Sequence, residues 1–313
     1  MSYQLDDKMV IGVSSRALFD LTVENEIFER EGVEAYCRYQ IEHEKDILKP
    51  GPGFALIQSL LELNHGYQGR EPVEVVIMSH NSPDSSLRVF HTIKHYGLQI
   101  SRAVLVSGAS LAPYLTAFHT DLFLSADEED VQCAIDNGIA AGIICTENNR
   151  QARSGQIRIA FDGDAVLFTD ESERIFQERG LRAFEENETR NAEKPLAEGP
   201  FTKFLRKLSD LQKLLGEENC PIRTALVTSR CAPTHERVLR TLHTWKVRVD
   251  EVFFLGGMEK QDVLKAFGAQ IFFDDQSVHT LSASQAVPAA LVPYCRSRKR
   301  DNSLDDISTY RTG

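Results

Sequence analysis

Short apolar segments alternate with longer amphipathic segments along almost the whole chain, and this alternation constrains the fold more than any other feature. Segments rich in β-branched and aromatic residues predict strands at 9–14, 73–79, 103–107, 121–125 and 140–145, and again at 157–162, 223–228, 250–255, 270–274 and 288–292. Helical periodicity predicts helices between them, at 54–64, 84–96, 111–119 and 127–137, then at 171–186, 201–216, 234–245, 259–267 and 279–285. Continuous apolar strands joined by helical crossovers are typical of a parallel sheet with helices on both faces. The predicted fold class is therefore α/β.

The second half of the chain repeats the pattern of the first. The segment "LRVFHTIKHYGLQISRAVLVSG" (87–108) aligns with "ERVLRTLHTWKVRVDEVFFLGG" (236–257) at a constant shift of 149 residues. Upstream, "IFEREGVEAY" (27–36) aligns with "IFQERGLRAF" (175–184) at a shift of 148. A register kept over such a length is hard to attribute to chance, and it indicates an internal duplication.

We therefore expect two similar Rossmann-like parallel-sheet domains, over 1–148 and 149–295. The polar segment 147–156 has the composition of a linker and would join them. The end of the chain, 296–313, is basic and then acidic and is rich in Ser and Asp, so it is expected to be disordered.

Composition and charge exclude several classes of protein. The 313 residues carry a formal net charge of −11, which disfavours a broad contact with a nucleic acid polymer. No apolar run approaches the roughly 20 residues that cross a bilayer, and "MSYQLDDKMV" does not resemble a signal peptide. The six cysteines show no C-x-x-C spacing and suit reduced thiols. We expect a cytoplasmic protein without a membrane partner, and a homo-oligomer is compatible with the sequence.

Polar side chains gather at the ends of the strands predicted in the second half. They are Asp162 and Asp164, Thr228 and Ser229, Lys260 (which opens a helix after "FFLGG"), and Asp274 and Asp275. In a parallel α/β sheet, ligands bind beyond the carboxyl ends of the strands. These residues are therefore expected to form one site.

This set of residues suits phosphoryl transfer through a covalent aspartyl phosphate on Asp162. A carboxylate that attacks a phosphate dianion is repelled by it, so a hard divalent cation has to lie between them. Mg²⁺ prefers oxygen ligands and uses only one or two carboxylates from the protein. Asp162, Asp274 and the backbone carbonyl of Asp164 would be its ligands, and Asp275 would bind a metal-bound water.

The remaining groups of the set would handle the phosphate and the proton. Lys260, Thr228 and Ser229 would hold phosphate oxygens and balance charge in the transition state. Asp164 would protonate the leaving alkoxide and then activate the hydrolytic water. Simpler interpretations stay open at this point, because Lys260 can be a solvated helix lysine and Thr228 and Ser229 can cap the next helix.

The four motifs resemble those of the haloacid dehalogenase-like phosphohydrolases, as "DGDAV", the strand that ends in Thr228, Lys260 and "FFDD". More narrowly, "FDGDAVLFTDESE", "TALVTSRCAPTHERV" and "GAQIFFDDQ" are similar to the cytosolic 5′-nucleotidase type 1 family, as are "SSRALFD" and "HNSPDSSLRV" in the first half. The resemblance implies Mg²⁺-dependent hydrolysis of nucleoside 5′-monophosphates. It also implies a flap over the site, formed by the segment after Asp170.

The first half lacks the charged residues of the set. At the shift of 149, the positions of Asp162, Asp164, Lys260, Asp274 and Asp275 hold Val13, Ser15, Leu111, Ser125 and Ala126. We therefore expect a catalytically degenerate first domain that helps to form the nucleoside pocket.

The candidate substrate-binding residues are Ser15, Arg16, His80 and Asn81 in the first half, and Asp170 and Arg230 in the second. The last of these is equally compatible with an ordinary surface ion pair. Two alternatives to a nucleotidase remain at this stage. One is a phosphatase of another small phosphomonoester such as a sugar phosphate, and the other is a non-catalytic nucleotide-binding protein.

Overall fold

The computed structural model describes residues 5–65, 71–145, 155–216 and 219–294. The predicted disordered tail over 296–313 and nearly all of the predicted join over 147–156 lie outside the described residues. No helix within the described part of the chain is both long enough and apolar enough to span a bilayer.

The centre of the structure is a single ten-stranded sheet with the order β3-β2-β1-β4-β5-β10-β9-β6-β7-β8. Its strands are β1 (Met9–Val13), β2 (Val73–Ser79), β3 (Arg102–Leu105), β4 (Leu122–Ser125), β5 (Ala140–Ile144), β6 (Ile157–Phe161), β7 (Ile222–Thr228), β8 (Glu251–Phe254), β9 (Ile271–Asp274) and β10 (Ala289–Leu291). Neighbouring strands pair in parallel except β5 and β10, which are antiparallel. The predicted α/β class, with a mostly parallel Rossmann-like sheet, is confirmed, and every predicted strand is present.

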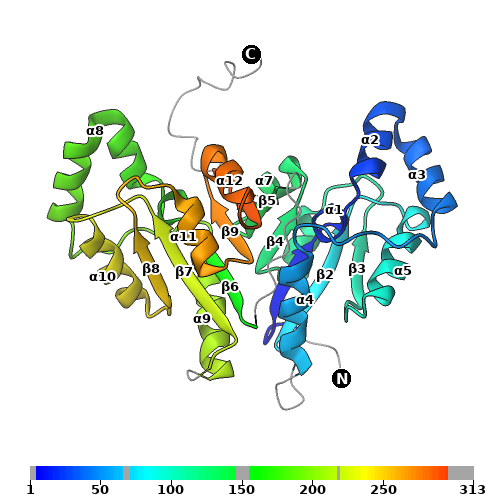
Figure 1. Ribbon diagram of the computed structural model, residues 1–313, viewed down its shortest axis with the longest axis horizontal. Helices are drawn as coiled ribbons and strands as arrows, with labels where there is room; N and C mark the ends of the chain where they lie inside the picture. The colour runs from blue at the N-terminus through cyan, green and yellow to red at the C-terminus, as the bar shows by residue number, and fades with distance from the viewer. Residues whose placement is uncertain (1–4, 66–70, 146–154, 217–218, 295–313) are drawn as a thin grey trace.

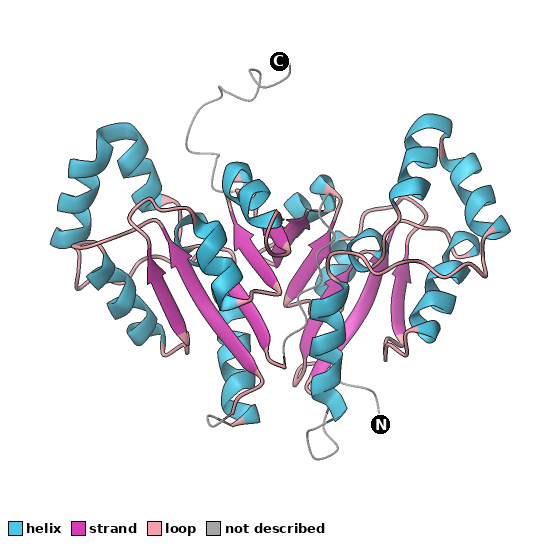
Figure 2. Ribbon diagram, viewed as in Figure 1, coloured by secondary structure: helices cyan, strands magenta, loops and turns pink. Residues whose placement is uncertain are grey.

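Helices flank the sheet (Figures 1 and 2). They are α1 (Ser15–Leu18), α2 (Thr22–Glu31), α3 (Val33–Glu42), α4 (Phe54–Glu62), α5 (Leu87–His95), α6 (Ala112–Ala117), α7 (Glu128–Asp136), α8 (Glu171–Arg190), α9 (Thr202–Leu215), α10 (His235–Trp245), α11 (Lys260–Phe267) and α12 (Ser277–Ser284). All the predicted helices are found. The sequence analysis missed α1, α2 and α3, because α1 is a single turn and the other two bury few residues and so lack an apolar stripe.

The helices at the two outer ends of the molecule are built alike. In Figure 1, α8 and the pair α2–α3 project at the same end of the view, on opposite sides. Gly32 separates α2 from α3 with φ 83° and ψ −177°, and Gly180 breaks α8 with φ 79° and ψ 177°. Such backbone angles favour glycine, since a side chain there is strained. Helix α8 ends at Arg190, four residues beyond the predicted end of this helix at 186.

Equivalent side chains make equivalent backbone contacts in the two halves. Arg88 Nε donates to the Asp46 carbonyl oxygen at 2.9 Å, and Arg237 Nε donates to the Lys194 carbonyl oxygen at 2.9 Å. The strand order β3-β2-β1-β4-β5 on one side of the sheet mirrors β8-β7-β6-β9-β10 on the other. The two halves therefore share their topology and part of their hydrogen bonding.

The two halves share one hydrophobic core as well as one sheet. Buried residues from Met9 to Val292 form a contiguous apolar cluster. Helix α4 of the first half contacts β6, and α9 of the second half contacts β1. At the antiparallel junction, a Cβ on Gly142 of β5 would lie 2.9 Å from Ala290 Cβ of β10 and 3.1 Å from the Phe273 ring. The absence of a side chain at Gly142 therefore allows the two halves to approach closely.

Gly142→Ala is expected to lower the free energy of unfolding by about 1–3 kcal/mol, because the added methyl group overpacks this junction. Denaturant titration measures the change. Gly155→Ala is the matched control, because a Cβ there meets no atom within 4 Å. Equal stability of the two variants would contradict the close packing of β5 against β10.

Candidate active site

Three aspartates from neighbouring strands meet at one edge of the sheet. Asp162 follows β6, and Asp274 and Asp275 end and follow β9. One carboxylate oxygen from each lies within 4.8 Å of the other two, and all three residues are buried. The strands bring them together because β6 and β9 are paired, with Phe161 opposite Phe273. The rings of these two phenylalanines stack at 5.7 Å directly before the acids, which holds the strand ends in register.

Lys260, the first residue of α11, lies between two of these acids. Its Nζ donates to Asp162 Oδ1 at 2.6 Å and to Asp274 Oδ2 at 2.6 Å, and its side chain is only 5% exposed. Burial opposes the charge, but the two carboxylates outweigh it and raise the pKa of Lys260. The lysine is therefore a buried cation, and the interpretation of Lys260 as a solvated helix lysine is wrong.

One ammonium group does not neutralise three carboxylates. Burial raises the pKa of Asp162, and the neighbouring Asp274 adds to the shift against the opposing effect of Lys260. Burial and the charge of Asp162 raise the pKa of Asp275 to about 8. Burial acts the same way on Asp274, but His279 and Lys260 outweigh it and lower its pKa. Its charge is the best stabilised of the three.

The donor set of this cluster fits a hard divalent cation. Carboxylate oxygens are the ligands that such ions prefer, and a bound cation would favour the ionised forms of Asp162 and Asp275. Among the described residues, Asp162, Asp274 and Asp275 are the group whose ligand atoms converge closely enough to hold a metal ion. The carboxylate of Asp164 is not part of this group.

Asp164 instead faces Arg230. The short turn Gly163–Leu167 follows Asp162, and Ala165 within it has φ 62°. From this turn the Asp164 carboxylate accepts from Arg230 Nε at 2.8 Å and from Nη2 at 2.7 Å. This fork-to-carboxylate geometry fixes the direction of both carboxylate oxygens.

A second buried carboxylate holds the other side of Arg230. Glu188 of α8 accepts from Arg230 Nη1, from Arg237 Nη1 at 2.8 Å and from the Ser172 hydroxyl at 3.0 Å. Burial alone would raise the pKa of Glu188, but the two arginines outweigh it and lower that pKa. The interpretation of Arg230 as a surface ion pair is wrong, since its side chain is 2% exposed.

Thr228 and Ser229 take different positions at the end of β7. Thr228 is buried, and its Oγ1 accepts from the Arg230 backbone nitrogen at 3.3 Å. A Cβ on Gly163 would lie 3.4 Å from that hydroxyl, so Thr228 adjoins the turn that carries Asp164. Ser229 is exposed. Neither caps α10, which begins only at His235, so the interpretation as caps is wrong.

Tyr294 completes the cluster and links it to the first half. Its hydroxyl donates to Asp275 Oδ2 at 2.6 Å. Gln132 of α7 donates from Nε2 to the Tyr294 carbonyl oxygen at 2.9 Å. Tyr294, Glu188 and Gln132 are not among the residues predicted from the sequence. The alignment offered a signal for Glu188 alone, because the shift of 148 places it opposite the polar Gln40.

The candidate residues of the first half lie at the ends of β1 and β2. Ser15 Oγ is 3.2 Å from Ser79 Oγ, Asn81 accepts from the Tyr36 hydroxyl at 3.0 Å, and His80 Nε2 is 2.8 Å from Asp130 Oδ2 of α7. Four strands lie between β1 and β6 in the sheet. The lateral distance between β1 and β6 is therefore about 24 Å at the usual strand spacing, and the two strands run in opposite directions because β5 and β10 are antiparallel.

Two other candidates lie outside both groups. Arg16 is half-buried in α1. Asp170 precedes α8 without capping it, and its Oδ2 lies 3.7 Å from Arg174 Nε.

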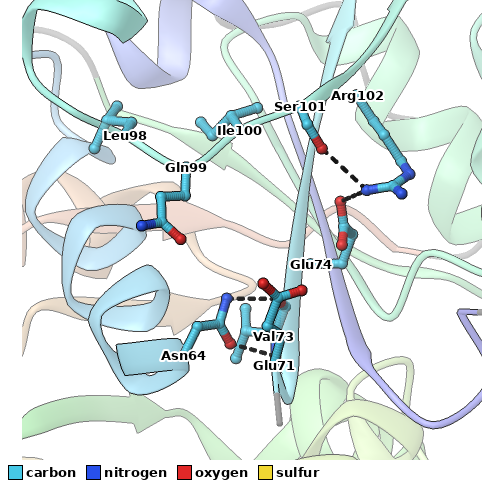
Figure 3. Close-up of a pocket in the computed structure, with 9 residues that line it drawn as sticks. All are labelled: Asn64, Glu71, Val73, Glu74, Leu98, Gln99, Ile100, Ser101 and Arg102. Atoms are coloured by element: carbon cyan, nitrogen blue, oxygen red, sulfur yellow. Dashed lines mark hydrogen bonds and ion pairs between the residues drawn. The ribbon is translucent and has the colours of Figure 1, made fainter. Parts of the chain in front are cut away.

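A surface pocket of about 310 Å³ lies far from these groups, where β2 and β3 begin. Figure 3 shows that Arg102 reaches Glu74 and Ser101, and that Asn64 bonds both backbone groups of Val73. None of the candidate site residues lines this pocket, and its polar side chains already have hydrogen-bond or ion-pair partners. It adds nothing to the site at the ends of β6, β7 and β9.

A parallel α/β sheet with a lysine and a buried acidic cluster at its strand ends defines a Rossmann-like protein with a site for a metal ion. Comparison with known sequences goes further: the chain belongs to the 5′-nucleotidase family, whose sequence model matches residues 1–299. It is 40% identical over 288 residues to human "Cytosolic 5'-nucleotidase 1B", a match that covers 88% of this chain and 47% of that protein. The chain therefore spans about half the length of this relative.

A comparison with solved structures found a chain from "Structure of Pnkp1/Rnl/Hen1 complex". The match has a TM-score of 0.33 and 12% identity, and it covers 92% of this chain and 96% of the other. A similarity at this level carries no argument about fold or function.

In metal-free buffer, the stability of the protein is expected to fall as the pH rises toward 8. Asp275 keeps its proton in the folded protein up to about pH 8, whereas an unfolded aspartate ionises near pH 4. The stabilising contribution of this proton is fully present below about pH 4 and is lost as the pH rises through the folded value. Asp275→Asn should flatten the dependence by up to about 1.4 kcal/mol per pH unit between pH 5 and 8.

Thermal unfolding of the wild type and the variant across this pH range measures the difference. Asp210→Asn, which changes an exposed aspartate, is the control and should leave the slope as it is. Parallel pH profiles for wild type and Asp275→Asn would contradict the raised pKa of Asp275.

Proposed function

We propose that this protein is a Mg²⁺-dependent 5′-nucleotidase that hydrolyses nucleoside 5′-monophosphates to nucleoside and phosphate. The observation that supports it most directly is the convergence of Asp162, Asp274 and Asp275 around Lys260 in a member of the 5′-nucleotidase family. A phosphomonoester carries two negative charges, and a buried cation beside carboxylates provides both a phosphate contact and a nucleophile.

Asp162 is proposed as the nucleophile. Its carboxylate oxygen forms a bond to phosphorus while the bond from phosphorus to the 5′ oxygen of the nucleoside breaks. Lys260, Thr228 and Ser229 would bind the other phosphate oxygens, where their donors stabilise charge that develops in the transition state. Lys260 is suited to this task because it is already held beside Asp162 at 2.6 Å.

Asp164 is proposed as the acid and base of the reaction. In its protonated form it gives a proton to the departing 5′ oxygen, and the carboxylate that remains then takes a proton from the water that attacks the phosphoaspartate, which restores the protonated form. That second attack breaks the bond between Asp162 and phosphorus, which regenerates the carboxylate and releases phosphate. The position of Asp164, two residues after Asp162 on the same turn, suits both proton transfers.

Mg²⁺ would be held by Asp162, Asp274 and the backbone carbonyl of Asp164, with Asp275 bound through a water. When bound, the ion supplies positive charge that reduces the repulsion between carboxylate and phosphate. The Tyr294 hydroxyl donates to Asp275 Oδ2 at 2.6 Å, so it would orient the Asp275 carboxylate toward the metal-bound water.

We also infer that the chain arose by internal duplication, with a degenerate domain over 1–148 and a catalytic domain over 149–295. The mirrored strand order and the matching contacts of Arg88 and Arg237 support this inference. The positions that correspond to the acids and the lysine hold neutral residues in the first half. The first half would then keep the sheet topology and lack the catalytic residues.

The first half is proposed to form part of the nucleoside pocket through the loops after β1 and β2, which include Ser15, Arg16, His80 and Asn81. Helix α7 supports this idea, because its Asp130 binds His80 and its Gln132 holds Tyr294 beside the acidic cluster. Asp170, at the start of α8, is proposed as a further contact to the substrate. A cytoplasmic location is proposed from the name of the human relative, which calls that protein cytosolic.

Asp162→Asn is expected to lower the turnover of AMP by a factor on the order of 10⁴ or more with the fold intact, because it removes the charge of the nucleophile and little volume. Phosphate release in the presence of Mg²⁺ measures the effect, and EDTA should stop the wild-type reaction. Asp262→Asn, at an exposed position of α11, is the control. Full activity of Asp162→Asn, or indifference to EDTA, would refute the mechanism.

A substrate panel separates the alternatives. AMP, IMP and dCMP are expected to be hydrolysed with much higher kcat/KM than sugar phosphates. Preference for a sugar phosphate would replace the proposed substrate class, and binding of nucleotides without turnover would favour a non-catalytic nucleotide-binding protein.

His80→Ala and Asn81→Ala are each expected to raise KM for AMP several-fold and to change kcat little, because neither residue belongs to the acidic cluster. Steady-state kinetics measures both constants. His119→Ala, which removes an exposed histidine of the same half, serves as control. An unchanged KM in both variants would exclude His80 and Asn81 from the pocket.

A further inference from the structure

We infer that Arg230 is the positioning residue of Asp164, and that Glu188 on α8 holds Arg230 in place for this task. The inference rests on the proposed function, in which Asp164 transfers protons to the leaving group and from water. It gives Arg230 a role other than a direct contact with the substrate.

The geometry of the guanidinium group supports this role. Nε and Nη2 of Arg230 both donate to Asp164, and Nη1 donates to Glu188, so each of its three nitrogens faces a carboxylate. The ring of Phe184 covers the group, with Arg230 Cζ 5.2 Å from the ring centroid. An arginine that is 2% exposed and has a carboxylate partner on each nitrogen is poorly placed to bind a substrate phosphate.

Charge balance points the same way. Arg230 and Arg237 carry two positive charges, and Glu188 and the ionised form of Asp164 carry two negative charges that neutralise them at contact distance. A buried charge left without its partner is strongly destabilising. Removing Arg230 would therefore leave both Asp164 and Glu188 with fewer charge partners in a buried setting.

The first half offers an internal comparison, because it lacks the acid. At the shift of 149, Ser15 stands at the position of Asp164 and Asn81 at the position of Arg230. In contrast, the counterpart of Arg237 is Arg88, which keeps both its charge and its backbone contact. The arginine that touches the acid is absent where the acid is absent, whereas the arginine that only supports the fold is present in both halves.

Glu188, the carboxylate that holds Arg230, is likewise absent from the first half. At the shift of 148, Gln40 takes the position of Glu188, and Arg88 is neutralised by Glu24 instead. A carboxylate at position 188 is thus present in the half where two buried arginines, Arg230 and Arg237, lie side by side and Arg230 also binds Asp164. Since Glu188, Phe184 and Ser172 all belong to α8, the orientation of Asp164 depends on the placement of this helix.

A double-mutant cycle tests the inference. The variants are Arg230→Asn, Asp164→Ser and the combination of both, and kcat/KM for AMP is measured with saturating Mg²⁺. Arg230→Asn should lower kcat/KM about 10- to 100-fold, within the range of a general acid that has lost its orientation. In the Asp164→Ser background the same change should cost less than about twofold, because the group that Arg230 positions is already gone. Additive losses would overturn the inference.

The leaving group provides a readout that a general loss of structure would not change. p-Nitrophenyl phosphate releases a phenolate that needs no proton, so Arg230→Asn should lower its kcat/KM much less than that for AMP. The inhibition constant of adenosine as a competitive inhibitor should stay within about twofold of the wild-type value. Equal losses with both substrates, or a much weaker inhibition by adenosine, would mean that Arg230 supports the whole site or binds the substrate directly.

Two further variants keep the test informative. Arg230→Lys retains the charge but not the fork that binds both carboxylates, so it should fold and still show part of the selective loss with AMP. Its full activity on AMP would contradict the need for a fork. Arg206→Gln, which breaks a forked pair with Glu198 at the surface, is the matched control and should keep wild-type kinetics.

The outcome is distinguishable from a failure of the proposed function. A wild-type protein that hydrolyses no nucleoside monophosphate would refute the nucleotidase itself. Active wild type with additive effects in the cycle would refute only the role of Arg230.

Discussion

Two buried carboxylates share a single ammonium group, and the rest of the site depends on this arrangement. Lys260 lies 2.6 Å from both Asp162 and Asp274, where water is largely excluded. Like charges at the ends of adjacent strands would repel each other without that lysine. A third acid, Asp275, stands beside them and accepts from the Tyr294 hydroxyl, so three carboxyl groups face one ammonium group, and a divalent cation would balance the charge of their ionised forms.

The frame that holds these acids is the parallel sheet itself. Paired strands place consecutive polar residues at one edge, and the stacked rings of Phe161 and Phe273 prevent the ends of β6 and β9 from shifting against each other. The carboxylate of Asp164 is held in a different way. Arg230, which follows β7, binds Asp164 and is itself bound by Glu188 of α8. The proposed nucleophile, Asp162, thus lies at the end of a core strand, whereas the proposed proton-transfer group, Asp164, is linked through Arg230 to the peripheral helix α8.

The sequence was sufficient for the sheet and for the acidic cluster because both follow from local signals. Each strand has its own apolar run, and the carboxyl end of a strand is where its polar residues emerge, so Asp162, Lys260 and Asp274 could be expected to meet. Glu188 and Tyr294 were missed because their partners lie far away in the chain, and nothing in a polar helix or a terminal segment indicates such contacts. Helices α2 and α3 were not predicted for a related reason, since helices that face solvent show little hydrophobic periodicity.

The antiparallel contact of β5 with β10 has a consequence for how such a molecule could have evolved. Either half alone would expose the backbone of its last strand as an open edge, ready to pair with another chain. In this molecule β5 and β10 cover each other's open edge, as the edge strands of two protomers do in a dimer with a continuous sheet. If the two halves arose by the proposed duplication, the first half could lose its reactive groups as long as it kept β5, which pairs with β10.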